Sequence, residues 1–236
     1  MKKLYDKNEL RFSLVWIVAY VVLFSAADAL SARLGTAKLV TAPVTVLMAL
    51  FLLCWLRKHG LWEKYGLCMP GGSLRRYLYF LPLVLIASTN LWFGAALRFS
   101  VPETVLYVVS MLGVGLIEEL LFRGFLFKTL CAEGVGRAIA VSSITFGLGH
   151  IVNLLNGAEA GATLLQLCYA AAVGFLFTVI FYKSGSLLPC IAAHSAINVL
   201  SAFGAQRPEG FELAGAAALT LLSLAYGAWL LKKATA

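Results

Sequence analysis

The sequence predicts an all-α fold, a polytopic membrane helical bundle of about eight transmembrane helices. Of its 236 residues, 61% are hydrophobic and only 13% are charged, and the mean hydropathy is +0.88. A soluble domain is typically about 45–50% apolar and about 25% charged. A soluble chain of this length could not bury so much apolar surface, whereas a lipid bilayer accepts it. We therefore expect one transmembrane domain over residues 1–236.

Eight apolar stretches are long enough to be membrane spans. Crossing the hydrocarbon core takes about 20 mostly apolar residues in a helix. Turn-forming or charged residues separate the stretches, as in Lys183-Ser184-Gly185-Ser186. The stretches are Phe12–Ala32, Leu39–Leu56, Tyr77–Leu97, Thr104–Phe127, Ala138–Leu155, Ala162–Tyr182, Leu187–Phe203 and Leu213–Leu231.

The basic residues between these stretches predict the orientation in the membrane. Lys and Arg collect in cytoplasmic loops. If the N-terminus is cytoplasmic, the inner segments hold Lys2, Lys3, Lys7, Arg11, Arg57, Lys58, Lys64, Arg75, Arg76, Lys128, Arg137, Lys183, Lys232 and Lys233, and the outer segments hold Arg33, Lys38, Arg98 and Arg207. This bias of 14 to 4 predicts that both termini are cytoplasmic. No basic run is interleaved with exposed aromatic residues, so the net charge of +8 does not indicate a nucleic-acid partner.

Three ionisable residues interrupt the fourth apolar stretch. Placing the side chains of Glu118, Glu119 and Arg123 at membrane depth costs free energy, so an ionisable residue there is a candidate for function. Glu119 and Arg123 are four residues apart on a helix and can pair, while Glu118 points about 100° away from Glu119. One carboxylate can thus be neutralised while the other faces a cavity. The alternative is a helix end at which all three charges reach the membrane surface.

Two further stretches carry imidazole and amide groups. His150 lies in the fifth stretch, and His194 and Asn198 lie four residues apart on one face of the seventh. Depths estimated from the helical rise place these groups and Glu118 between the cytoplasmic surface and slightly past the membrane centre. We therefore expect a single water-filled pocket that opens to the cytoplasm.

These groups suit hydrolysis of an amide without a covalent intermediate. Glu118 can take a proton from water, His150 can position that water, and His194 and Asn198 can stabilise an oxyanion. Arg123 would hold Glu119 in a supporting ion pair. No GxSxG motif indicates a nucleophilic serine.

A metal-dependent reaction is the alternative chemistry. Two His and one Glu are a known ligand set for catalytic zinc, here Glu118, His150 and His194. The HExxH motif is absent, so the ligands would come from three helices. We expect no cofactor, with zinc as the alternative.

The motifs resemble those of a known family. Glu-Glu-x-x-x-Arg at 118–123, Phe-x-x-x-His at 146–150 and His-x-x-x-Asn at 194–198 occur in this order, each in a predicted span. They resemble the CAAX-protease and bacteriocin-processing family of intramembrane glutamate endopeptidases, within a motif-bearing core of about residues 105–200. The resemblance implies that Glu118 activates water with help from His150, and that His194 and Asn198 form the oxyanion site. Glu119 and Arg123 match further positions of the same motif.

The resemblance also implies a partner and a location. Eukaryotic members of the family cleave prenylated CAAX proteins, and bacterial members are linked to bacteriocin maturation and self-immunity. We expect a membrane-associated peptide or protein substrate, with or without a lipid, at a bacterial plasma membrane, with the site facing the cytoplasm. Two other functions stay open: a non-catalytic immunity or scaffold protein, and a proton-coupled transporter that uses Glu and His as relays.

Overall fold

A computed structural model describes residues 1–69, 80–205 and 211–233. The described residues form helices joined by turns, and their one recorded β-contact is an isolated bridge between Ala95 and Gly204. The predicted all-helical class is confirmed. The start of the predicted third span at Tyr77, and the basic residues Arg75, Arg76 and Arg207, lie outside the described residues.

The described helices follow one another along the chain. They are α1 (Lys2–Lys7), α2 (Glu9–Arg33), α3 (Thr41–Lys58), α4 (Leu81–Ala87), η2 (Ser88–Leu91), α5 (Val101–Glu119), η3 (Leu120–Phe127), α6 (Lys128–Leu130), η4 (Cys131–Glu133), α7 (Val135–Gly149), α8 (Val152–Leu155), α9 (Ala160–Ser184), α10 (Leu188–Leu200) and α11 (Phe211–Lys232).

Among the described residues, six helical segments are long and apolar enough to cross a membrane. They are 9–33, 41–58, 101–133, 135–154, 160–184 and 211–232, and each coincides with one of the predicted stretches. The predicted stretches Tyr77–Leu97 and Leu187–Phe203 contain the shorter apolar helices Leu81–Leu91 and Leu188–Leu200. The chain is thus a multi-spanning membrane protein.

Local sequence signals set several helix ends. Ser100 and Glu103 form a capping box at the start of α5, and Pro102 follows at a position where no helical N–H is required. Gly185 ends α9 with φ of +68°, a left-handed conformation that glycine adopts at little cost. The chain then turns directly into α10, which begins with Leu188 and Pro189.

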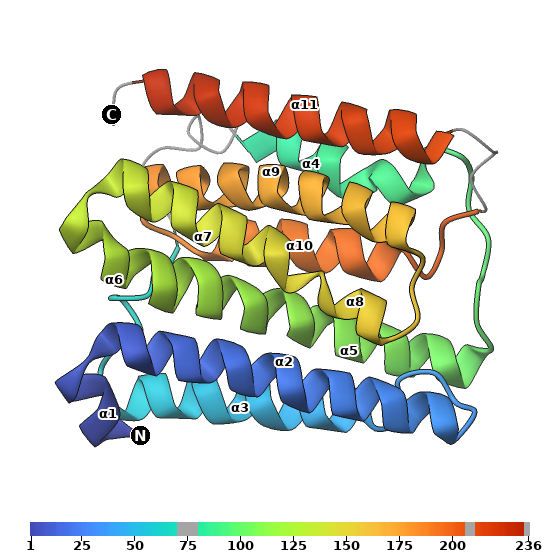
Figure 1. The fold of residues 1–236 in the computed structure, drawn as a ribbon, viewed down its shortest axis with the longest axis horizontal. Coiled ribbons are helices and arrows are strands. Elements are labelled where there is room, and N and C mark those ends of the chain that lie inside the picture. The colour runs from blue at the N-terminus through green and yellow to red at the C-terminus, as the bar shows by residue number, and fades with distance from the viewer. Residues whose placement is uncertain (70–79, 206–210, 234–236) are drawn as a thin grey trace.

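The long helices lie side by side and alternate in direction, so the bundle has two ends (Figure 1). The terminus end carries α1, the last residues of α3 and α11, and the connections 128–134 and 185–187. The opposite end carries the turn 34–40, the start of α5, helix α8 and the starts of α9 and α11.

Glycines allow the helices that carry the motifs to approach closely. A Cβ on Gly115 of α5 would lie 2.8 Å from the backbone nitrogen of Ser195 in α10, and one on Gly147 of α7 would lie 2.8 Å from Ala171 Cβ in α9. Small residues at helix contacts are typical of membrane bundles, where close packing replaces the hydrophobic effect. The segment before His150 is therefore fixed against α9, and the segment before Glu118 is fixed against α10.

Candidate functional site

The double glutamate lies where α5 changes into another helical form. Glu118 and Glu119 end α5, and Leu120–Phe127 continues it as a π-helical segment in which every residue is buried. Wider helical turns of this kind are frequent at functional sites. The segment carries Arg123 into the interior of the bundle, four residues after Glu119.

Glu119 and Arg123 form the predicted ion pair, and it is fully buried. Arg123 Nη1 donates to Glu119 Oε1 at 2.9 Å, and both side chains have 0% exposure. The guanidinium carbon lies 4.0 Å from the centre of the Phe146 ring, in range for a cation–π contact. A helix end with charges reaching the membrane surface is excluded for these two residues.

His194 joins the two glutamates, a contact that the sequence did not predict. Its Nδ1 lies 2.7 Å from Glu119 Oε1, and its Nε2 lies 3.4 Å from Glu118 Oε2. Because an ionised carboxylate only accepts hydrogen bonds, Nδ1 carries a proton toward Glu119. Glu119 therefore orients the imidazole so that Nε2 faces Glu118.

Tyr20 contributes a second, unpredicted contact to Glu118. Its hydroxyl donates to Glu118 Oε1 at 2.5 Å, from a helix 98 residues away in sequence. Tyr20 is 8% exposed. The two oxygens of Glu118 thus have different neighbours, Tyr20 at Oε1 and His194 at Oε2.

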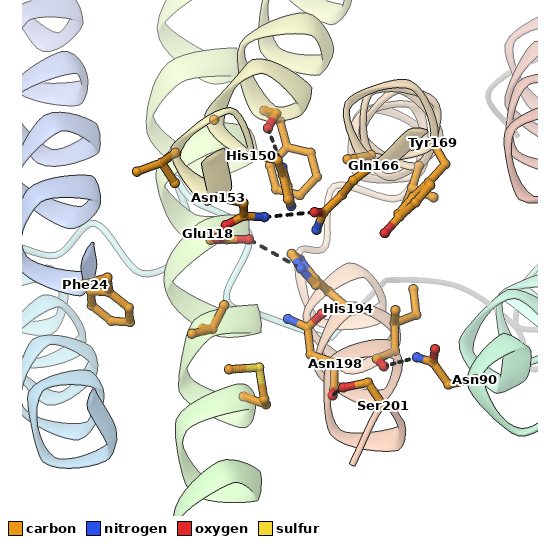
Figure 2. A pocket seen from close by; sticks show the side chains of 18 of the residues that line it. Phe24, Asn90, Glu118, His150, Asn153, Gln166, Tyr169, His194, Asn198 and Ser201 are labelled. Carbon is orange, nitrogen blue, oxygen red and sulfur yellow. Dashed lines mark hydrogen bonds and ion pairs between the residues drawn. The ribbon is translucent and has the colours of Figure 1, made fainter. Parts of the chain in front are cut away.

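A pocket of about 460 Å³ brings the predicted catalytic residues together. Glu118 of α5, His150 at the end of α7, and His194 and Asn198 of α10 all line it (Figure 2). Glu119 and Arg123 are not among its lining residues. The separation of the two carboxylates, one toward the cavity and one behind it, agrees with the predicted 100° offset.

His150 enters the pocket because α7 ends beside it. It is the C-cap residue after Gly149, and its Nδ1 lies 3.1 Å from the backbone oxygen of Phe146. Since a carbonyl only accepts, Nδ1 is the donor, and Nε2 of the neutral ring is left with a lone pair. That nitrogen can accept a hydrogen bond from water.

Two pocket amides were also missed by the sequence reasoning. Asn153 Nδ2 donates to Gln166 Oε1 at 2.8 Å, which ties α8 to α9 beside the glutamate and the histidines (Figure 2). Hydropathy does not distinguish an uncharged amide in an apolar stretch from its neighbours as a candidate for function. Only the folded arrangement shows that both line the pocket.

The pocket occupies one half of the bundle. Its lining residues on α2 lie between Tyr20 and Asp28, those on α9 between Gln166 and Val173, and it also includes Lys38 of the turn after α2. All these positions lie between the middle of the bundle and the end opposite the termini (Figure 1). The predictions of cytoplasmic termini and of a cytoplasm-facing pocket therefore cannot both be right in this structure.

The three residues of the alternative zinc site all line the pocket. Across residues 1–69, 80–205 and 211–233, no group of three His, Cys, Asp or Glu side chains is placed to hold a metal ion. Both nitrogens of His194 face the carboxylates of Glu118 and Glu119. Glu118, His150 and His194 thus line one pocket without forming a ligand set as they stand.

Comparison with known proteins places this site in a family. Residues 100–200 match the family model described as type II CAAX prenyl endopeptidase Rce1-like. These residues belong to the Rce1-like family. The match spans every motif that carried the resemblance, from Glu118 to Asn198. The match supports a protease at the level of the family. No curated protein and no solved structure matches the chain.

Proposed function

We propose that this protein is an intramembrane endopeptidase that uses Glu118 to activate water. The observation that carries the proposal is the placement of Glu118 in the pocket, with Tyr20 at one carboxylate oxygen and His194 at the other. A carboxylate held in this way, within a cavity that admits water, fits general-base hydrolysis. The Rce1-like match supports the same class of reaction.

In the proposed reaction, Glu118 takes a proton from water while the water oxygen bonds to the scissile carbonyl carbon. His150 orients this water through Nε2. The oxyanion accepts hydrogen bonds from His194 Nε2 and from the Asn198 amide, which requires His194 to be protonated on both nitrogens. Glu118 then passes its proton to the leaving nitrogen as the carbon–nitrogen bond breaks, and no covalent intermediate forms.

Glu119 and Arg123 act as positioning residues in this proposal. Glu119 fixes the ring of His194 through Nδ1, and Arg123 neutralises Glu119 inside the bundle. Phe146 separates the ion pair from the cavity: its ring contacts Arg123 on one side and His194 on another, at 5.6 Å between ring centroids. No cofactor is part of this reaction.

We further propose eight membrane crossings with both termini in the cytoplasm. The two shorter helices, 81–91 and 188–200, would complete the six long ones. An even number of crossings agrees with α1 and the end of α11 lying at the same end of the bundle (Figure 1). The substrate would be a membrane-associated peptide or protein, with or without a lipid.

The test replaces Glu118 by its neutral isostere. Glu118→Gln keeps the shape of the side chain and removes the base, so we expect a folded protein without turnover. Peptides released from membranes by the wild type but not by Glu118→Gln, identified by mass spectrometry, would name the substrate. Glu9→Gln at the terminus end is the matched control and should release the same peptides as the wild type. Turnover by purified Glu118→Gln would contradict the proposed role of Glu118. A wild type that releases no peptide would instead favour a non-catalytic immunity or scaffold role.

A chelator separates the two chemistries in the same assay. If the mechanism is metal-independent, EDTA or 1,10-phenanthroline leaves peptide release unchanged. Loss of release that added Zn²⁺ restores would instead support the zinc alternative. A farnesylated CAAX peptide and its unprenylated form, offered in parallel, would show whether a prenyl group is required.

A further inference from the structure

The pocket and the terminus end lie on opposite sides of Glu118. Glu118 is near the middle of the long segment Val101–Glu133, and the pocket residues of that segment run from Tyr107 to Phe122. Tyr20 is the pocket residue of α2 nearest the N-terminus, and the lining continues from it toward Arg33. The cavity therefore extends from the centre of the bundle toward the turn 34–40.

Packed side chains close the route from Glu118 to the terminus end. Leu120, Arg123, Phe125 and Phe177 are each 0% exposed, and Phe181 is 1% exposed. Interiors packed in this way contain few voids larger than a water molecule. Through the part of the chain that the structure describes, a substrate thus has no path to Glu118 from the terminus end.

The mouth of the pocket is polar and aromatic. Lys38 Nζ lies 2.8 and 2.9 Å from the two oxygens of Asp28, and both residues line the pocket together with Trp92, Phe93 and Tyr107. Aromatic residues of this kind are typical of the membrane–water interface. The cavity thus reaches from the membrane centre to the surface opposite the termini.

The two ends differ in basic residues. Among the described residues, the terminus end carries Lys2, Lys3, Lys7, Arg11, Arg57, Lys58, Lys64, Lys128, Arg137, Lys183, Lys232 and Lys233, and the opposite end carries Arg33, Lys38 and Arg98. Lys38 is already paired with Asp28. A bias of twelve to three places the terminus end in the cytoplasm by the positive-inside rule.

We propose that the active-site pocket opens to the extracytoplasmic side of the membrane, and that its substrate is a peptide segment presented from that side. The substrate class rests on the proposed peptidase function, whereas the orientation rests on the charge bias and on the position of the cavity. A protein segment that has been translocated, or the outer part of a membrane-anchored peptide, can reach Glu118. A soluble cytoplasmic protein cannot.

The experiment labels one cysteine at each end of the bundle. Cys68 is an exposed native thiol at the terminus end, and Ala158, exposed between α8 and α9, lies at the opposite end. One variant keeps Cys68 and replaces the other four cysteines by alanine; its partner is cysteine-free apart from Ala158→Cys. Intact cells and permeabilised cells are treated with a membrane-impermeant maleimide. A green fluorescent protein or an alkaline phosphatase fused after residue 236 repeats the test on the otherwise unchanged chain.

We expect the maleimide to label Ala158→Cys in intact cells and Cys68 only after permeabilisation. We also expect the green fluorescent protein fusion to fluoresce and the alkaline phosphatase fusion to be inactive. Labelling of Cys68 in intact cells, alone or together with Ala158→Cys, would overturn the proposal. So would an Ala158→Cys thiol that reacts only after permeabilisation. If the cysteine variants do not accumulate, an active phosphatase fusion overturns the proposal by itself. The same labelling of Glu118→Gln shows that orientation is independent of turnover, so failure of one proposal leaves the other testable.

Discussion

At the scale of single residues, the site is a chain of polar contacts that starts in a sealed interior and ends in a cavity. Arg123 binds Glu119, Glu119 binds His194, His194 faces Glu118, and Glu118 accepts from Tyr20. The last three members, His194, Glu118 and Tyr20, line the pocket. The arrangement gives two adjacent glutamates distinct tasks, since one is held by an arginine and the other is left to meet water.

Removing the Tyr20 hydroxyl tests the hydrogen bond to Glu118. Hydrogen bonds to charged groups contribute about 1.5–3 kcal/mol, or about 10- to 150-fold in rate if the bond acts in the transition state. We therefore expect Tyr20→Phe to lower kcat by about 10- to 100-fold with little change in KM, because Tyr20 orients the base. Steady-state kinetics of peptide cleavage would check this.

Tyr226→Phe in α11 is the matched control for Tyr20→Phe. The Tyr226 hydroxyl is buried without a hydrogen-bond partner among the described residues, so its removal should leave kcat and stability unchanged. A Tyr20→Phe protein with wild-type kcat would show that the contact has no part in catalysis.

Breaking the buried ion pair should destabilise the protein, and neutralising both partners should restore part of the loss. Removing one partner of a buried pair costs about 3–5 kcal/mol, because the remaining charge is left unpaired. We expect Arg123→Met to lose about that much, and Arg123→Met with Glu119→Gln to recover a large part of it. Unfolding of the purified proteins in detergent measures the difference. A double variant less stable than Arg123→Met would contradict the assigned pairing.

At the scale of helices, close contacts fix the distances between the proposed catalytic groups. Gly115, three residues before Glu118 in α5, packs against the backbone of Ser195, the residue after His194 in α10. Any side chain there must push α5 and α10 apart, and with them the carboxylate and the imidazole. The separation of 3.4 Å between Glu118 and His194 depends on this contact.

A single methyl group at Gly115 should thus abolish most activity. The added Cβ of Gly115→Ala would lie 2.8 Å from Ser195 N and 2.9 Å from Ser195 Cα, too close without a shift of the helices. Gly136→Ala in α7 is the control, because a Cβ there meets nothing within 4 Å and alanine is the better helix former. Cleavage rates and thermal unfolding of the two variants would be compared. Equal activity in both would show that the α5–α10 distance does not limit the reaction.

Hydropathy and charge could predict the helices and the ionisable part of the site. A membrane requires long apolar stretches, and a charged residue within such a stretch stands out in the sequence. The six long spans, the Glu119–Arg123 pair and the convergence of Glu118, His150, His194 and Asn198 follow from periodicity and from the cost of buried charge. Tyr20, Asn153 and Gln166 could not be found in this way. A tyrosine or an amide in an apolar helix is ordinary, and partners 98 residues apart leave no local pattern.

At the scale of the whole molecule, helix length determines where the cavity lies. Helix α7 ends at Gly149 and α10 ends at Leu200, while the longer α2, α5 and α9 continue past them toward the opposite end (Figure 1). The space beyond the short helices is lined by residues such as His150 and Ser201, at or just past these ends. Depths counted from predicted span boundaries could not show this, because they assumed that every span crosses the full membrane.

The orientation should depend on the total charge bias rather than on the first helix alone. Replacing Lys2, Lys3, Lys7 and Arg11 by glutamine leaves eight described basic residues at the terminus end against three at the other. The first spanning helix, α2, would then have no basic side chain at its N-terminal end and would have Arg33 and Lys38 at its C-terminal end. If that helix alone set the orientation, the protein would insert the other way round. We expect the fourfold variant to keep the wild-type orientation, because the helices after α2 carry the remaining bias. Fluorescent-protein and phosphatase fusions at the C-terminus would decide, and an inverted or mixed population would show that the N-terminal residues alone set the side on which the pocket opens.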